Sequence, residues 1–433
     1  MPPQSRGAPL DALGRLVAAH WRTGAGITSI CSAHPLVLEA TMMEAASSGG
    51  PILIEATSNQ VNQEGGYTGL RPQAFRAQVL EIASRHNIDA DRVLLGGDHL
   101  GPNPWRRESA ADAMAQGEHL VEEYAAAGFT KIHLDCSMPC GDDMAPLSDE
   151  IVSARAACLL AAAERAAPNP NLISYIIGTE VPVPGGATEA IAGLEPTTPE
   201  AARRTLTAHR DAFEAAGLDD AWSRVRGLVV QPGVEFDEWN VVDYDPERTK
   251  SLQDVLDGPS GMVYEAHSTD YQTPTALSDL VRDHWAVLKV GPGLTFALRA
   301  ALFALEAIER ELCPEQTRSH LRATLDDRMR AEPRWWRDYY ADDVDARLAR
   351  RYSYSDRARY YWPDEQVRAA QARLFANLAA VEIPMPLISQ TLPRQYDRIR
   401  AGTLIGEPHA LVLDHIADVL RTYRAACTAP ARG

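Results

Sequence analysis

The sequence predicts an α/β protein, a (β/α)8 TIM barrel followed by a helical C-terminal extension. Short apolar runs rich in β-branched residues, typical of buried strands, alternate with segments whose apolar residues have helical spacing. There are eight such runs, and eight parallel strands close a barrel. A doubly wound open sheet is the alternative, but no GxGxxG motif follows the first run to support it.

The elements follow one another along the first 300 residues. The expected strands are 24–31, 51–56, 92–95, 130–134, 172–177, 227–230, 262–266 and 286–290. Helical spacing marks 35–47, 71–86, 111–128, 199–216 and a helix that begins near Thr295. Thr198 and Pro199 suit the cap and the first position of one of these helices. We therefore expect an N-terminal segment (1–23), a barrel that carries the active site (24–305) and a helical extension packed on it (306–433).

The extension has no strand pattern and no low-complexity linker, and it carries two aromatic clusters. One is Trp335, Trp336, Tyr339 and Tyr340, and the other is Tyr352, Tyr354, Tyr360, Tyr361 and Trp362. Aromatic residues at helical spacing belong to a packed core more often than to a binding platform. We favour the core interpretation here.

Composition excludes several classes of partner. The chain has 433 residues, 45% hydrophobic and 23% charged, and a formal net charge of −17, which disfavours nucleic acid and anionic membranes. No apolar run approaches the ~18 residues of a membrane span, and the N-terminus lacks a signal-peptide core. The six cysteines form no framework, and the CxxxC of Cys136 and Cys140 is a weak metal signal. We expect a protein of the reducing cytoplasm.

The third strand leads directly into Gly96, Gly97, Asp98 and His99. An acid and an imidazole at the C-terminal end of a buried strand lie where barrels place their chemistry. The carboxylate can accept a proton, and a neutral histidine is a common ligand of zinc and similar ions. Taken alone, such a pair is more often a helix cap and a structural hydrogen-bonding group than a catalytic pair.

Other strands end in the same way, which favours an active site over a chance pair. In a barrel, all strand C-termini face one mouth. The polar residues expected there are His34, Asn59, Gln60, Asp98, His99, Asp135, Ser137, Glu180, Gln231, Glu235, His267, Asp270 and Lys289. Histidines and carboxylates at several strand ends could bind one divalent metal ion. The set predicts an enzyme, or a protein descended from one.

Seven long motifs resemble the GatZ/KbaZ family over nearly the whole chain. They are SNQVNQEGGYTGLRP (58–72), GGDHLGPNPW (96–105), HLDCSMPC (133–140), GTEVPVPGG (178–186), EAHSTDYQ (265–272), KVGPGLTFALR (289–299) and RYSYSDRARYYWP (351–363). The family is described as the second subunit of class II D-tagatose-1,6-bisphosphate aldolase. Members have also been called tagatose-6-phosphate kinases, and some are active 4-epimerases of tagatose 6-phosphate and fructose 6-phosphate.

The chain is also distantly similar to class II, metal-dependent aldolases. In those enzymes a DH pair supplies the base and a metal ligand, which matches Asp98 and His99, and an HGxSG-like motif supplies a further ligand, which matches His267. The remaining histidine ligand falls where this chain has Gln231, Pro232 and Gly233. This departure would require Gln231, Glu235 or Glu180 to substitute.

The chemistry favours the epimerase over the kinase. No GxxxxGK[ST] motif or Gly-rich kinase loop is present to bind ATP phosphates. In a 2-ketose the C4 proton is not acidic, but the C4 hydroxyl is β to the ketone, so the C3–C4 bond can break by a retro-aldol reaction. We therefore expect a metal-dependent 4-epimerase that interconverts D-tagatose 6-phosphate and D-fructose 6-phosphate, with a non-catalytic aldolase subunit as the alternative.

The expected roles complete this hypothesis. The acid–base group is Asp98, with Asp135 and Glu180 as further catalytic candidates, and the metal ligands are His99 and His267, with Glu180 and Gln231 as weaker candidates. The ion is zinc, with manganese, cobalt or nickel as alternatives. Substrate contacts are expected from Asn59, Gln60, Ser268, Asp270, Lys289, Gly291, Gly293 and Arg357. A partner aldolase subunit and self-association into a homo-oligomer are both compatible with the sequence.

The expected phosphate site lies at the loops after the last two strands. Gly291 and Gly293 permit close backbone approach at a helix N-terminus, as in many barrels. Asp270 would repel a phosphate, so Arg357 of the extension is the candidate for an extra cation. The alternative is that Arg357 only forms salt bridges with the acidic barrel surface.

Overall fold

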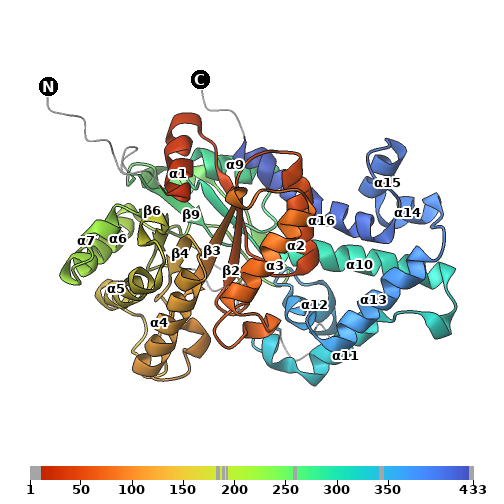
Figure 1. Ribbon diagram of the computed structural model, residues 1–433, viewed down its shortest axis with the longest axis horizontal. Coiled ribbons are helices and arrows are strands. Elements are labelled where there is room, and N and C mark those ends of the chain that lie inside the picture. The colour runs from red at the N-terminus through yellow and green to blue at the C-terminus, as the bar shows by residue number, and fades with distance from the viewer. Residues whose placement is uncertain are drawn as a thin grey trace.

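The computed structural model describes residues 11–181, 186–187, 191, 194–256, 261–340 and 346–428. Eight parallel strands form a closed barrel in the order β1-β10-β9-β6-β5-β4-β3-β2, and helices surround it (Figure 1). The barrel strands are β1 Ile27–Ile30, β2 Ile52–Thr57, β3 Val93–Leu100, β4 Lys131–Leu134, β5 Ser174–Ile177, β6 Val225–Val229, β9 Val263–Ala266 and β10 Val287–Val290. The predicted TIM barrel is therefore confirmed.

The helices alternate with the strands as the sequence predicts. They are α1 Ala12–Thr23, α2 Pro35–Ala46, α3 Pro72–Arg85, α4 Ala110–Ala126, α5 Asp149–Ala166, α6 Pro199–Ala215, α7 Asp219–Trp222, α8 Pro246–Thr249, α9 Pro274–Arg282 and α10 Pro292–Leu312. The Thr198 hydroxyl accepts a hydrogen bond from the N–H of Ala201, so the predicted cap of α6 is confirmed. A short hairpin, β7 Glu235–Phe236 with β8 Val241–Val242, follows β6.

Strand β3 is longer than the sequence predicts. It continues through Gly96 and Gly97 and pairs with β2 as far as Asp98. A Cβ on Gly96 would lie 2.7 Å from Cγ of Glu55, and one on Gly97 would lie 2.4 Å from Cδ1 of Leu100. The two glycines therefore make room for neighbouring side chains and do not end the strand. Their effect is to place Asp98 within the sheet.

Helix α1 is held at the strand N-termini by a buried charge. The Asp11 carboxylate caps α1 by accepting the N–H of Gly14 at 2.6 Å, and it pairs with Arg226 of β6 at 2.8 Å. Apolar side chains of α1, among them Leu13 and Val17, pack with inward-facing residues of the strands. This apolar layer fills the end of the barrel formed by the strand N-termini. The active site is therefore expected at the opposite end, where the strand C-termini lie.

The C-terminal region is entirely helical within the described residues. Its helices are α11 Leu321–Ala331, α12 Ala346–Tyr352, α13 Glu365–Ala379, α14 Met385–Thr391, α15 Pro393–Arg400 and α16 Pro408–Cys427, and α13 to α15 lie on one side of the barrel (Figure 1). The predicted domain boundary at residue 306 falls inside the continuous helix α10. None of the helices in the described part of the chain combines the length and apolar character that a membrane span requires.

The last helix returns to the barrel. Helix α16 packs against α2, α9, α10 and strand β1. The carbonyl of Cys427 accepts the N–H of Gly26 at 2.9 Å, and the Tyr423 hydroxyl donates to the carbonyl of Thr269 at 2.6 Å. The C-terminal helix is therefore part of the outer layer of the barrel.

The segment before α13 is anchored at the barrel mouth by Asp356. Its buried carboxylate accepts hydrogen bonds from Nε of Arg299 at 2.6 Å and from the Thr295 hydroxyl at 2.5 Å, both on α10. The Arg299 guanidinium also donates to the carbonyl of Ser353. These contacts fix the short 3₁₀ helix Arg357–Tyr361 over the strand ends.

This anchor predicts a large loss of stability in Asp356→Ala. The substitution leaves the buried Arg299 guanidinium without its counter-ion, and breaking a buried ion pair costs about 3–5 kcal/mol. Urea denaturation measures the change in the free energy of unfolding. The control is Asp338→Ala, which removes an exposed pair with Arg107 and should change that free energy by less than about 0.5 kcal/mol. Equal effects of the two substitutions would contradict the anchor.

Candidate active site

A layer of charged side chains crosses the inside of the barrel. The Lys131 ammonium lies 2.7 Å from Oε1 of Glu55 and 2.8 Å from Oε2 of Glu265. Lys289 lies 3.2 Å from Glu55 and 2.5 Å from Oδ1 of Asp98. All five side chains are buried. Three carboxylates face two ammonium groups, so this layer has an excess of negative charge.

The pair formed by Asp98 and Lys289 is fully charged. Burial would raise the pKa of Asp98, but the charges of His99 and Lys289 hold that pKa well below its usual value. Burial would lower the pKa of Lys289, but Asp98 and the other nearby carboxylates hold it well above its usual value. A protonated lysine is not a nucleophile, so this state of Lys289 does not support Schiff-base chemistry.

Three histidines lie above the charged layer. The rings of His99 and His267 are 4.8 Å apart between centroids, and His133 lies 5.2 Å from each of them. His133 Nδ1 is 3.1 Å from Oδ1 of Asp98, and His267 Nε2 is 3.2 Å from Oε1 of Glu265. Burial, followed by the charge of Lys289, lowers the pKa of His267 to about 3, so this imidazole is neutral, as a metal ligand must be.

Four of these residues could hold one metal ion. Asp98, His133, Glu265 and His267 each offer a ligand atom, and these atoms lie within 4.8 Å of one another. The Nε2 atom of His133 is buried and has no hydrogen-bond partner. A buried polar atom without a partner is costly, and coordination would remove that cost. The donor set of imidazole nitrogens and carboxylate oxygens therefore fits a divalent transition metal.

His133 is absent from the set of ligands expected from the sequence, although its strand contains the signal. Successive side chains of a strand point to opposite faces, so Lys131 and His133 share the inner face of β4. A histidine two residues after an inward-facing lysine also faces the inside of the barrel, where Asp98 lies. Reading the strand ends alone misses it, because His133 lies within the strand.

His99 lies beside the metal-capable group. Its Nδ1 atom is 2.7 Å from Oδ2 of Asp135, and its Nε2 atom is 3.7 Å from Oδ2 of Asp98. His99 has a left-handed backbone conformation, with φ of 48°. A carboxylate that orients a histidine is a common outer partner of metal ligands. Asp135 is therefore placed to position His99 and does not line the cavity.

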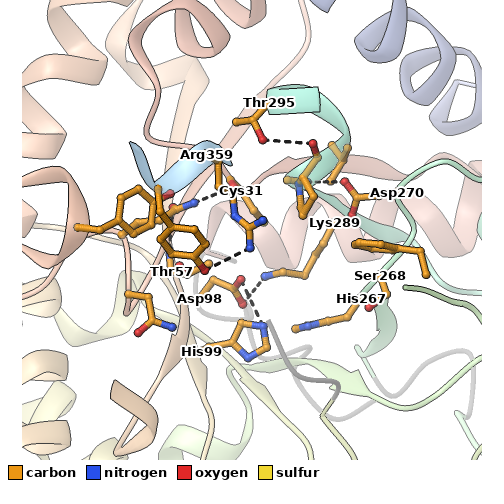
Figure 2. A pocket seen from close by; sticks show the side chains of 18 residues that line it. Cys31, Thr57, Asp98, His99, His267, Ser268, Asp270, Lys289, Thr295 and Arg359 are labelled. Atoms are coloured by element: carbon orange, nitrogen blue, oxygen red, sulfur yellow. Dashed lines mark hydrogen bonds and ion pairs between the residues drawn. The ribbon is translucent and has the colours of Figure 1, made fainter. Parts of the chain in front are cut away.

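The site opens into a cavity in which Lys289, Arg359, Asp98 and His267 point toward a common space (Figure 2). The predicted residues that line it are Asn59, Gln60, Asp98, His99, His267, Ser268, Asp270, Lys289 and Gly291. Cys31, Thr57, Tyr67, Phe236, Val290, Pro292, Thr295, Arg359 and Tyr360 complete the lining. Carboxylate, imidazole and cationic side chains therefore meet in one cavity.

The expected phosphate-binding amides are paired within the protein. Asp270 Oδ1 accepts the N–H of Gly291 at 3.0 Å and that of Gly293 at 2.7 Å. This carboxylate occupies the position at the N-terminus of α10 where an anion would bind. The Gly291 and Gly293 amides, expected to bind the substrate phosphate, are therefore already occupied.

Three further predicted residues are engaged elsewhere. Glu180 Oε2 accepts the Thr197 hydroxyl at 2.5 Å, and Gln231 Oε1 accepts the N–H of Gly233 at 2.8 Å. Neither side chain belongs to the metal-capable group or lines the cavity. Arg357 donates from Nε to the carbonyl of Trp335 and stacks on Tyr339. The arginine that reaches the cavity is Arg359, two residues further on.

Comparison with known proteins agrees with this architecture. The family model described as D-tagatose-1,6-bisphosphate aldolase subunit GatZ/KbaZ-like matches residues 13–428. The crystal structure of a probable tagatose 6 phosphate kinase from Sinorhizobium meliloti 1021 is 50% identical, with a TM-score of 0.86, and covers 93% of this chain and 100% of its own.

More distant similarities are to aldolases. A fructose-bisphosphate aldolase from Campylobacter jejuni is 14% identical, with a TM-score of 0.47, over 86% of this chain and 94% of its own. The YdjI aldolase from Escherichia coli K12 is 13% identical, with a TM-score of 0.43, over 71% of this chain and 89% of its own. The extent of the family match is decisive, and the chain belongs to the GatZ/KbaZ-like family.

Proposed function

We propose that this chain is a metal-dependent epimerase that interconverts D-tagatose 6-phosphate and D-fructose 6-phosphate at C4. One observation carries the proposal: an ionised carboxylate, Asp98, belongs to a group of metal-capable side chains at the floor of a cavity that the cationic side chains of Lys289 and Arg359 also line. Membership of a family described as an aldolase subunit supports a sugar-phosphate substrate.

Retro-aldol chemistry explains why an aldolase-like site suits this reaction. A base takes the proton of the C4 hydroxyl, the C3–C4 bond breaks, and its electron pair moves toward the C2 carbonyl. The aldehyde fragment then rotates, and the bond forms again on its other face. A divalent ion at the site would stabilise the negative charge that develops on the oxygens of the ketone fragment.

The residues have separate tasks in this proposal. His133, Glu265 and His267 would hold the ion, with His99 as the further candidate that the sequence suggests. Asp98 accepts the C4 hydroxyl proton and returns it after the bond has formed again. The Lys289 ammonium beside Asp98 keeps this carboxylate ionised. Asn59 lines the cavity and is placed to bind a sugar hydroxyl. Gln60 also lines it, but its amide accepts the N–H of Thr57 and donates to the carbonyl of Cys31, so its role is to hold the wall in place.

A second candidate function is a non-catalytic subunit of a class II aldolase. The family description, which names a subunit, favours it. The kinase activity named for the Sinorhizobium protein is less suitable, because this sequence has no GxxxxGK[ST] motif. The purified chain, given fructose 6-phosphate and a divalent metal, should form tagatose 6-phosphate. Failure to do so, combined with activation of a separate aldolase subunit, would favour the second function.

The metal site predicts the behaviour of His133→Asn. The asparagine amide can replace the contact of Nδ1 with Asp98 but cannot reach the position of Nε2. Bound metal, measured by mass spectrometry of the purified protein, should fall from about one ion per chain to a small fraction, and turnover should fall with it.

The matched control is His209→Asn on α6. His209 is equally buried and its Nε2 atom also lacks a partner, but it lies outside the metal-capable group. This variant should keep its metal. Equal metal content in wild type and His133→Asn would contradict the assignment.

The proton transfer predicts the behaviour of Asp98→Asn. The amide keeps the shape of the carboxylate but cannot accept the proton, so kcat should fall roughly 10²-fold or more, the usual scale for acid–base catalysis. Metal content should fall less than in His133→Asn, because His133, Glu265 and His267 are retained and the asparagine oxygen can still coordinate an ion. Steady-state kinetics and metal analysis on the same sample test both points, and an unchanged kcat would exclude Asp98 as the base.

A further inference from the structure

A second cavity lies next to the candidate active site. Tyr67, Thr295 and Arg359 line both cavities, so these three side chains form the boundary between them. The second cavity has a volume of about 430 Å³ and lies between the start of α2, helix α3 and the start of α13. The mechanism above makes no use of it.

The lining of this cavity is rich in hydrogen-bond donors. Its charged residues are Arg359 and Arg368, and no carboxylate is among the residues that line it. Nε1 of Trp362, a residue only 2% exposed, is buried without a hydrogen-bond partner, and so is Nε2 of Gln78. Buried donors without partners are rare in proteins and indicate a missing acceptor.

His34 adds a further donor. Its Nδ1 atom accepts the N–H of Leu36 at 3.2 Å at the start of α2. The proton of a neutral imidazole is then on Nε2. Burial lowers the pKa of His34 to about 4, so the ring is neutral at physiological pH.

The nearest acidic residue along the chain does not oppose an anion here. Asp364 follows Pro363 of the cavity wall, and its carboxylate pairs with Arg328 at 2.8 Å and caps α13 through the N–H of Gln366. Its charge is therefore already balanced within the protein. Asp356 lies behind the boundary residue Thr295, whose hydroxyl it accepts at 2.5 Å, and its charge is balanced by Arg299. An anion in the cavity would therefore meet two guanidinium groups and several uncharged donors.

We propose that this second cavity binds the phosphate group of the ketose phosphate while the sugar lies in the first cavity. The inference rests on the proposed function. A phosphate monoester has three acceptor oxygens and pairs well with arginine. The phosphate is at the end of the sugar remote from the ketone, so it would lie away from the metal-capable group and past Arg359. Asp270 occupies the amides where barrels usually bind phosphate, which leaves this cavity as the donor-rich alternative.

The test compares two arginines of α13. Arg368 lines the cavity and is exposed, so Arg368→Gln should fold normally, and Arg373→Gln, on the same helix but outside the lining, is the matched control. Calorimetric titration with fructose 6-phosphate should show affinity about tenfold weaker for Arg368→Gln, the scale of one lost charge-assisted contact, and unchanged for Arg373→Gln. Trp362→Phe, which removes the N–H donor together with part of the buried ring, should weaken binding severalfold, and urea denaturation of the same variant shows whether it is still folded.

A competition experiment with inorganic phosphate shows whether the cavity binds the phosphate group of the substrate or an unrelated anion. It should compete with fructose 6-phosphate, and Arg368→Gln should weaken its binding as well. Phosphate that binds without competing would identify an independent anion site and overturn the proposal, as would unchanged affinity of both cavity variants for fructose 6-phosphate. If the wild type binds fructose 6-phosphate in the expected way but forms no tagatose 6-phosphate, the cavity assignment stands and the epimerase proposal fails.

Discussion

The buried charge layer inside the barrel is the constraint on which the candidate site depends. Glu55, Lys131, Glu265 and Lys289 come from four different strands, and each compensates the charge of another. Charges removed from water are tolerated only when they are paired, and truncating one member of a buried pair costs about 3–5 kcal/mol. The strands must therefore close into a barrel with this register. The same closure places Asp98, His133 and His267 together above the layer.

The C-terminal helices complete the site and do not merely cover the barrel. The Asp356 carboxylate joins α10 to the segment that carries Arg359 and Tyr360, and these two side chains form one wall of the first cavity. Tyr360 stacks on Trp335 with 4.7 Å between ring centroids, and Arg359 donates a hydrogen bond to the Tyr360 hydroxyl. The aromatic clusters are thus mainly core, as the helical spacing predicts, but Tyr360 faces the cavity.

Most of the barrel could be predicted from the sequence because its strands are short, apolar and bounded by polar residues. The end of β3 could not, since Gly96 and Gly97 are required by contacts with Glu55 and Leu100 that no local pattern reveals. The return of α16 to β1 was equally hidden, because only tertiary packing brings residues 400 positions apart together.

The sequence predicts the site residues that reach the cavity because of their position on a strand. It does not reveal which side chains are already engaged in hydrogen bonds within the protein. Asp98 and His267 reach the cavity because strand ends face the mouth. Gln231 and Gly293 are equally close to strand ends, but internal hydrogen bonds occupy them. His133 falls inside the expected strand 130–134, whereas Asp98 follows the expected strand 92–95. The nitrogen of His133 that lacks a partner becomes evident only in three dimensions.

The retro-aldol route is tested most directly by fructose 6-phosphate that carries deuterium at C4. The bond between C4 and its hydrogen never breaks when C3–C4 is cleaved and formed again. The tagatose 6-phosphate product, analysed by mass spectrometry and NMR after reaction in ordinary water, should retain the full label at C4. Loss of deuterium to the solvent would show proton transfer at C4 and would contradict the account.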